Sequence, residues 1–119
     1  MFVVDFELLP IQFGTTEAPF VHATIDRVVV GMIQIRTPYQ DGICPFLNLW
    51  VDESSRKIGI GSYLVRAARI WASAKGAAAL SGLVEESNQS ALGFYKRLGF
   101  FESEEKTETG NTVVNLLLN

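Results

Sequence analysis

The 119-residue sequence contains one cysteine, Cys44, and one histidine, His22. A single cysteine excludes an intrachain disulfide, and a chain without disulfides suits a reducing compartment such as the cytosol. Because no cluster of His, Cys and Asp residues has metal-ligand spacing, we predict that the protein has no metal site. We interpret His22 as a structural residue of a strand, and Cys44 as a small buried or loop residue rather than a nucleophile.

An excess of basic charge is also missing. The sequence has 10 Lys and Arg residues against 13 Asp and Glu residues, a net charge of -3 and a pI near 5.1. A general nucleic-acid binder needs a basic face that displaces phosphate counterions, so we expect no nucleic-acid partner. No uncharged apolar run approaches the roughly 20 residues needed to cross a bilayer, and the N-terminus lacks the features of a signal peptide. We therefore expect a cytoplasmic protein that does not enter a membrane.

Hydrophobic residues, in contrast, make up 48% of the sequence. No repeat or linker divides them, so we expect a single domain over residues 1–119. Alternating apolar residues predict strands over residues 2–9 and 46–51. Short segments beside turns and a short apolar run predict further strands over residues 20–26, 28–36, 78–84, 100–104 and 112–118, and helical spacing predicts helices over residues 61–75 and 88–98. In the fourth strand, Leu47, Leu49 and Val51 are expected to share one face. This order predicts an α+β fold with a mixed, largely antiparallel sheet of about seven strands and two helices.

Residues 51–62 form the first motif, in which a predicted strand runs through a glycine-rich loop into a predicted helix. Gly59 and Gly61 let the backbone approach a ligand closely. The unpaired N–H groups of the first helical turn attract an anion such as a pyrophosphate, and Arg56 and Lys57 would add counter-charges. The pattern matches neither the dinucleotide-binding fingerprint nor the P-loop, and by itself it more often marks an ordinary turn.

Residues 88–100 form the second motif. Asn88 has the character of a helix N-cap, and Phe94 and Tyr95 have the character of core residues. Gly93 does not fit a purely structural interpretation, because a glycine inside a helix costs about 1 kcal/mol relative to alanine. We therefore expect close packing or a close ligand at Gly93.

Together the two motifs resemble those of the GNAT superfamily of acetyl-CoA-dependent N-acetyltransferases. The residues that carry the resemblance are Arg56, Gly59 and Gly61 after a strand, followed by Asn88 and Phe94-Tyr95-Lys96-x-Leu98-Gly99-Phe100. The resemblance implies transfer of an acetyl group from acetyl-CoA to an amine, with acetyl-CoA wedged between two parallel strands that splay apart. It also implies two helices after the first strand, for which the roughly ten residues before the predicted hairpin are too few. We therefore expect a GNAT-like fold that lacks the first two helices of the family.

The resemblance also implies which residues bind acetyl-CoA and which one is catalytic. The backbone of Trp50 and Val51 would pair with the pantetheine arm, and Asn88 would touch the arm from the other side. The pyrophosphate would be bound by the amides of the loop, those of Arg56, Lys57, Ile58, Gly59, Ile60, Gly61 and Ser62. Tyr95 would face the sulfur as general acid, since a tyrosine with a pKa near 10 is protonated at pH 7 and can donate to the departing thiolate.

The sequence leaves open which residue deprotonates the amine. Glu85 and Glu86 follow a predicted strand near the opening of the site and Glu53 is another candidate, but each is more simply a solvated carboxylate. Many members of the family carry a glutamate further inside this strand, where this sequence has Gly82 and Leu83. The missing base leaves an alternative function, a catalytically weak or inactive acetyl-CoA-binding module or subunit. A third alternative is a structural or interaction domain that binds no cofactor.

The expected acceptor is a small-molecule or peptide amine, whose identity the sequence does not specify. Without the two helices, one face of the sheet and one wall of the cleft would be exposed in a monomer. We therefore predict a homodimer whose two-fold interface covers this face. The alternative is that residues 11–19 fold back as a minimal lid.

Overall fold

The computed structural model describes residues 4–9, 20–36, 38–56 and 59–118. The elements in chain order are β1 (Val4–Leu9), β2 (Phe20–Ile25), β3 (Val28–Ile35), β4 (Ile43–Val51), a short 3-10 helix η1 (Glu53–Ser55), α1 (Ile60–Ala74), β5 (Ala79–Glu85), α2 (Gln89–Arg97), β6 (Phe101–Lys106) and β7 (Asn111–Leu117). The predicted α+β class, with seven strands and two helices, is confirmed. The segment over residues 11–19, considered above as a lid, lies outside the described residues.

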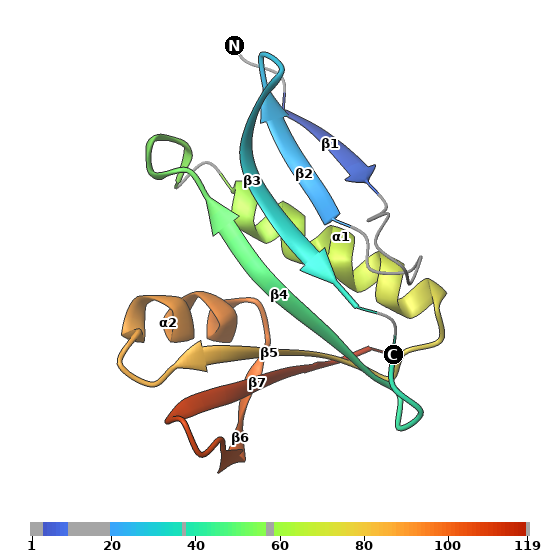
Figure 1. The fold of residues 1–119 in the computed structure, drawn as a ribbon, viewed down its shortest axis with the longest axis vertical. Helices are drawn as coiled ribbons and strands as arrows, with labels where there is room; N and C mark the ends of the chain where they lie inside the picture. The colour runs from blue at the N-terminus through green and yellow to red at the C-terminus, as the bar shows by residue number, and fades with distance from the viewer. Residues whose placement is uncertain (1–3, 10–19, 37, 57–58, 119) are drawn as a thin grey trace.

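The seven strands form one sheet in the order β1-β2-β3-β4-β5-β7-β6. Strands β4 and β5 run parallel, and all other neighbours are antiparallel. Helix α1 makes the crossover between the two parallel strands, and α2 connects β5 to β6 (Figure 1). The hairpin predicted around Asp26 and Arg27 is confirmed, since both residues have positive φ angles, 51° and 67°. The predicted mixed sheet with one parallel crossover is therefore present.

The parallel pairing of β4 with β5 is short. Its three pairs are Ile43 with Ala79, Cys44 with Leu80, and Pro45 with Ser81. Beyond these pairs the strands diverge, and we call the widening space between them the wedge; in the view of Figure 1, α2 is seen between the two strands. The arrangement leaves the last part of β4 unpaired by β5, as the resemblance implied.

Helix α1 forms because its apolar residues recur with helical spacing. Leu64, Ala68 and Ala72 are fully buried, and α1 packs against β2, β3 and β4. The helix ends where Gly76 takes a φ of 80°, and the N–H of Ala77 donates to the carbonyl of Ala72 at 3.0 Å. Gly76 therefore ends the helix, directly after the predicted range of residues 61–75.

Helix α2 is limited by Asn88, the predicted N-cap, and by Gly99. At its start, the side chain of Asn88 accepts a hydrogen bond from the N–H of Ala91 at 3.1 Å. At its end, Gly99 has a φ of 98°, and the N–H of Phe100 donates to the carbonyl of Tyr95 at 3.0 Å. This pattern is a Schellman cap, which satisfies carbonyls that would otherwise lack a partner.

Strand β4 differs from the prediction in its start and in its alternation. It begins at Ile43 rather than near residue 46, because its first residues pair with β5. Against β3, Val51 pairs with Gly31 whereas Leu47 pairs with Gln34, so that β4 contains one extra residue. Positions three apart on β3 lie on opposite faces, and the predicted common face of the strand is therefore wrong. A β-bulge reverses the alternation, which a simple period-2 pattern cannot reveal.

Both helices pack on one face of the sheet. The Cβ position of Gly31 faces Leu64 of α1. Phe46 lies on the same face of the sheet by the strand register, and its ring contacts Tyr95 of α2. In the described part of the chain, no helix covers the other face. Four large apolar residues that the register places on that face are 44–61% exposed, and they are Trp50, Leu83, Phe101 and Leu117.

Candidate functional site

The end of β4 is anchored by hydrogen bonds on both sides. The N–H of Asp52 donates to the carbonyl of Val30 at 2.7 Å, which ties the end of β4 to β3. The Nε of Arg56 donates to the carbonyl of Val51 at 3.1 Å. Arg56 is exposed, so its guanidinium lies at the surface beside the last residue of the strand. Two predicted loop residues, Lys57 and Ile58, lie outside the described residues.

Gly59 starts helix α1 without a capping side chain. Its φ is 87°, a left-handed conformation that glycine adopts without steric cost. The amides of residues 60–62 precede the first intrahelical bond, in which the N–H of Tyr63 donates to the carbonyl of Gly59. The first turn contains no acidic residue. The positive end of a 15-residue helix is therefore available to an anion.

Gly61 lies where α1 meets both β4 and α2. A Cβ atom at Gly61 would lie 3.2 Å from Cζ of Phe94 and 3.7 Å from Cγ2 of Val51. A packing reason for this glycine therefore exists beside the close approach of a ligand that the sequence suggested. The contact also brings the predicted pyrophosphate loop next to the end of β4 and to α2.

Trp50 and Val51, the residues expected to pair with the pantetheine arm, have β3 on one side and the wedge on the other. Trp50 pairs with Met32, and Val51 pairs with Gly31. The pairing of β4 with β5 ends at Pro45, so β5 does not reach these residues. An extended ligand can therefore lie beside the wedge edge of β4 as an added strand.

Tyr95 lies in an aromatic cluster at the base of the wedge. Its ring centroid is 5.7 Å from that of Phe46 and 5.2 Å from those of Phe94 and Phe100. Only 7% of the residue is exposed, and burial raises its pKa to about 12. Tyr95 is therefore protonated throughout the neutral range, although an acid with this pKa releases its proton less readily than an ordinary tyrosine.

Asn88 is exposed, and its side-chain oxygen is used by the N-cap bond to Ala91. The amide nitrogen of the same side chain remains a donor of two hydrogen bonds. Gly93, on the same helix, has no close neighbour: a Cβ atom there would meet only Nη1 of Arg97, at 3.5 Å. The described residues thus do not provide the close packing that was one of the two explanations for Gly93.

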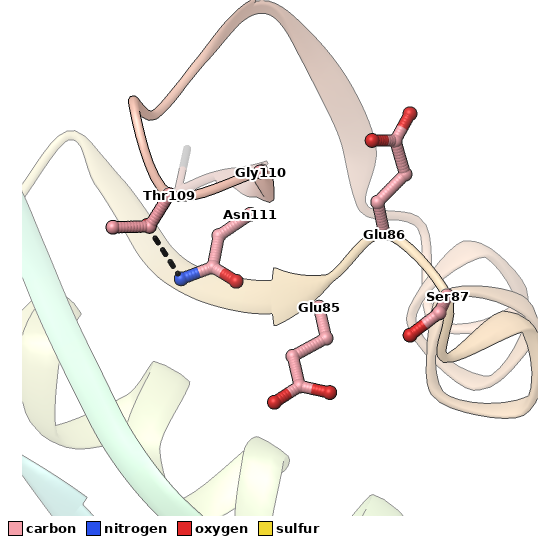
Figure 2. Close-up of a pocket in the computed structure, with 6 residues that line it drawn as sticks. All are labelled: Glu85, Glu86, Ser87, Thr109, Gly110 and Asn111. Carbon is pink, nitrogen blue, oxygen red and sulfur yellow. Dashed lines mark hydrogen bonds between the residues drawn. The ribbon is translucent and has the colours of Figure 1, made fainter.

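The candidate bases lie at the surface, at the end of β5 and in η1. Glu85 and Glu86 are exposed and line an open pocket of about 520 Å³ with Ser87, Thr109, Gly110 and Asn111. Figure 2 shows the two glutamates pointing in opposite directions from the end of β5. Across the pocket, Nδ2 of Asn111 donates to Oγ1 of Thr109 at 3.3 Å (Figure 2). Glu53, the third candidate, is exposed in η1.

The sequence did not indicate a functional role for two residues at the base of the wedge, Phe46 and Gly82. A Cβ atom at Gly82 would overlap the ring of Phe46, so the phenyl ring occupies the place of a side chain at position 82. The available signal was Gly82 itself, because a glycine inside a strand often marks a close approach. No pattern near Gly82 in the sequence indicated that Phe46 is the residue it contacts.

The described residues contain neither a metal cluster nor a membrane-spanning helix. No group of three or more His, Cys, Asp or Glu side chains among them is placed to hold a metal ion. None of the helices in this part of the chain has the length and apolar character needed to cross a bilayer.

A sequence profile described as the acetyltransferase (GNAT) family matches residues 4–100. The chain therefore belongs to the GNAT acetyltransferase family, and the resemblance found in its motifs is confirmed. No curated protein matches the chain.

Solved structures share the fold at low sequence identity. The IAA acetyltransferase of Bacillus cereus is 20% identical, with a TM-score of 0.80 over 98% of this chain and 100% of its own. The PaiA N-acetyltransferase of Thermoplasma acidophilum, solved with coenzyme A, is 20% identical with a TM-score of 0.76, over 86% of this chain and 62% of its own. YncA of Salmonella typhimurium, solved with its cofactor acetyl-CoA, is 17% identical with a TM-score of 0.73, over 86% of this chain and 65% of its own. At these identities the likeness establishes the fold.

Proposed function

We propose that the protein is an N-acetyltransferase that moves an acetyl group from acetyl-CoA to an amine acceptor. The observation that carries this proposal is the wedge between β4 and β5 beyond Pro45 and Ser81. One side of the wedge ends at the N-terminus of α1, where Gly59 provides no capping side chain. The base of the wedge borders Tyr95 of α2. In this proposal the anion site, the unpaired strand edge and the proton donor lie along one path. The proposal treats residues 1–119 as one such domain.

In this proposal, acetyl-CoA supplies an activated acetyl thioester to the wedge. The amides of residues 56–62 hold the pyrophosphate at the positive end of α1. The backbone of Trp50 and Val51 hydrogen bonds with the pantetheine arm, and Asn88 contacts the arm through its free amide nitrogen. Family members solved with coenzyme A or acetyl-CoA support this choice of cofactor.

Arg56 links the strand edge to the anion site. Its guanidinium is hydrogen-bonded to the Val51 carbonyl, a group that the arm would also use. We propose that Arg56 turns toward the pyrophosphate when acetyl-CoA binds, which releases this carbonyl for the arm. A guanidinium suits this exchange, because it donates to phosphate oxygens in a bidentate geometry.

The chemistry assigned to these residues is a direct attack. The amine nitrogen forms a bond to the acetyl carbon, the carbon–sulfur bond breaks, and Tyr95 donates its proton to the departing thiolate. A backbone N–H of β4 donates to the oxyanion of the tetrahedral intermediate. Because an amine with a pKa near 10.4 is only roughly one part in a thousand neutral at pH 7, its proton must pass to a base or to water. Glu85, Glu86 and Glu53 are the candidates for this base.

A second candidate function is an acetyl-CoA-binding module with little or no turnover. The observation that favours it is Leu83, which stands in the part of β5 where many family members carry a glutamate and is 61% exposed. A leucine cannot accept the proton of the amine. Release of free thiol with a panel of amines separates the two functions, because the module would bind acetyl-CoA and release no thiol with any amine.

We also propose that the protein works in the cytoplasm as a homodimer. The single cysteine supports the first part, since no disulfide is available to stabilise the chain outside a reducing compartment. The exposed apolar residues of the helix-free face support the second, because a two-fold interface would bury Leu83 and Phe101 of both copies. A partner copy would also supply a wall to the acceptor side of the wedge.

Calorimetric titration with acetyl-CoA tests the central proposal. We expect binding with a Kd below about 1 mM, the upper end of ordinary substrate affinities. Arg56→Met should bind about 10-fold more weakly, because a charge-assisted hydrogen bond to the pyrophosphate is lost. Arg66→Met, at an exposed position in the middle of α1, is the matched control and should bind as the wild type does. A wild-type protein that binds no acetyl-CoA contradicts the proposal.

A further inference from the structure

Outside their ladder, β4 and β5 meet at Phe46 and Gly82. Phe46 directly follows Pro45, the last residue of β4 that pairs with β5, and Gly82 directly follows Ser81 on the other strand. The Phe46 ring fills the space of the missing Gly82 side chain, since Cζ, Cε1 and Cε2 all lie within 2.8 Å of a Cβ built there. One aromatic ring thus closes the point at which the wedge begins.

The ring is held in place by its surroundings. Phe46 is 5% exposed, and its centroid lies 5.7 Å from that of Tyr95 and 5.9 Å from that of Phe100. Phe100 is itself 4% exposed. A ring packed on three sides in a close-packed interior cannot move aside without displacing its neighbours. The base of the wedge is therefore a rigid aromatic floor.

The length of the wedge matches the length of the arm that the proposed function places in it. The first turn of α1 lies against Val51, since a Cβ at Gly61 would be 3.7 Å from Cγ2 of that residue. Because of the bulge, the stretch from Val51 back to Phe46 spans only the four steps of β3 from Gly31 to Ile35, about 13 Å. An extended pantetheine arm, from phosphate to sulfur, is comparable to about four extended residues, on the order of 15 Å. An acyl group attached to the sulfur would then meet the Phe46 ring.

We propose that Phe46, by filling the place of a side chain at Gly82, limits the acyl group that the protein accepts to acetyl. The inference rests on the proposed function and adds a specificity-determining residue to it. The acetyl methyl group would touch the ring, and the further methylenes of a butyryl group would require space that the ring occupies. A rigid apolar pocket discriminates one methylene by about 10-fold or more.

Calorimetric titration with free CoA, acetyl-CoA and butyryl-CoA tests the inference without an identified acceptor. For the wild-type chain we expect free CoA and acetyl-CoA to bind, and butyryl-CoA to bind at least about 10-fold more weakly than acetyl-CoA. Phe46→Ala should bring the two acyl-CoA affinities within about 3-fold of each other, because the space at Gly82 becomes free. Phe46→Leu removes less volume from the core and should have an intermediate ratio of acetyl-CoA to butyryl-CoA affinity. This variant replaces Phe46→Ala in the test if Phe46→Ala does not fold.

Two further variants separate acyl selection from general loosening of the core. The double variant Phe46→Ala/Gly82→Leu refills the gap from the opposite strand and should restore the preference for acetyl-CoA. Phe100→Leu removes a ring from the same cluster but not from the gap, so it should lower the unfolding temperature and keep the wild-type ratio. Thermal unfolding of every variant establishes that it is folded.

The outcomes are distinguishable. A wild-type protein that binds no free CoA overturns the proposed function, and the inference with it. Binding of free CoA with equal affinities for acetyl-CoA and butyryl-CoA overturns the inference alone. The inference is also overturned when folded Phe46→Ala and Phe46→Leu variants keep the wild-type ratio.

Discussion

Gly61 and Phe94 meet so closely that a Cβ atom on the glycine would lie 3.2 Å from the Cζ atom of the ring. The contact joins the first turn of α1 to α2, across the end of the wedge. The missing side chain of Gly61 therefore lets the two helices approach each other at this position. A substitution there tests packing and the proposed pyrophosphate site at once.

We expect Gly61→Val to destabilise the protein by about 1–3 kcal/mol and to weaken acetyl-CoA binding. The branched atoms of valine extend beyond Cβ toward Phe94 and Val51, which displaces the loop amides from the anion. Gly61→Ala should change stability by less than about 1 kcal/mol, because the gain in helix propensity offsets a tight contact with a movable ring. Urea unfolding and calorimetric titration measure the two effects. Unchanged acetyl-CoA affinity in a folded Gly61→Val variant contradicts the assignment of the loop.

Tyr95→Phe should lower kcat by about 10²- to 10⁴-fold, while acetyl-CoA affinity changes little. The ring and its contacts with Phe46, Phe94 and Phe100 remain, so the variant should fold. Because the pKa of Tyr95 is about 12, the wild-type rate should not decline through loss of this proton below about pH 10. Steady-state thiol release, with an amine that the screen identifies, provides the measurement. Normal turnover by the variant, with chemistry rate-limiting, rules out the acid role.

Local patterns predicted the elements of this fold better than its bulge and its contacts. Helix α1 and the caps at Asn88 and Gly99 follow from spacing and from single-residue preferences, and the structure has them. The β-bulge of β4 interrupts an alternation that looked regular. The contact between Phe46 and Gly82 joins two strands separated by a whole helix, so no window of the sequence contains both partners.

The same distinction applies to the site. The glycine-rich loop could be predicted because a strand, two glycines and a helix are adjacent in the chain. The packing reason for Gly61 could not be predicted, since Phe94 belongs to a different helix. The hydrogen bond of Arg56 to Val51 depends on how the loop folds back, which composition does not encode.

The stability of the protein should decrease above about pH 9, in part through Cys44. Burial raises the pKa of this thiol from 9.0 to about 11, and its Sγ donates to the carbonyl of Arg36. Between these values the folded protein holds a proton that the unfolded chain has lost, so stability falls as pH rises, by at most about 1.4 kcal/mol per pH unit. Below pH 9 this group contributes no pH dependence. Urea unfolding from pH 7 to 11 should show a shallower decline for Cys44→Ala than for the wild type. Equal slopes would show that the thiol titrates as it does in the unfolded chain.

Gly93→Ala should stabilise the free protein by about 0.5–1 kcal/mol. The substitution adds helix propensity, and its Cβ would contact only the flexible end of Arg97. The comparison of unfolding curves without acetyl-CoA measures this effect. The second explanation for the glycine, a close ligand, requires that the same variant bind acetyl-CoA more weakly than the wild type. A loss of stability in the free protein would contradict the open surroundings of Gly93.

The helix-free face provides the test of the proposed homodimer. Leu83 and Phe101 on this face are 61% and 49% exposed, and a partner copy that covered them would remove apolar surface from water. Size exclusion with light scattering should therefore give the mass of a dimer for the wild type at tens of micromolar. Leu83→Glu places a charge in the interface and should shift the protein to a monomer, since a buried unpaired carboxylate costs several kcal/mol. Ile70→Glu is the matched control, because Ile70 is 62% exposed against 61% for Leu83 but lies on the outer side of α1. This variant should remain dimeric. A wild-type protein that is monomeric and active at these concentrations refutes the dimer, and an equal response of both variants refutes the choice of face.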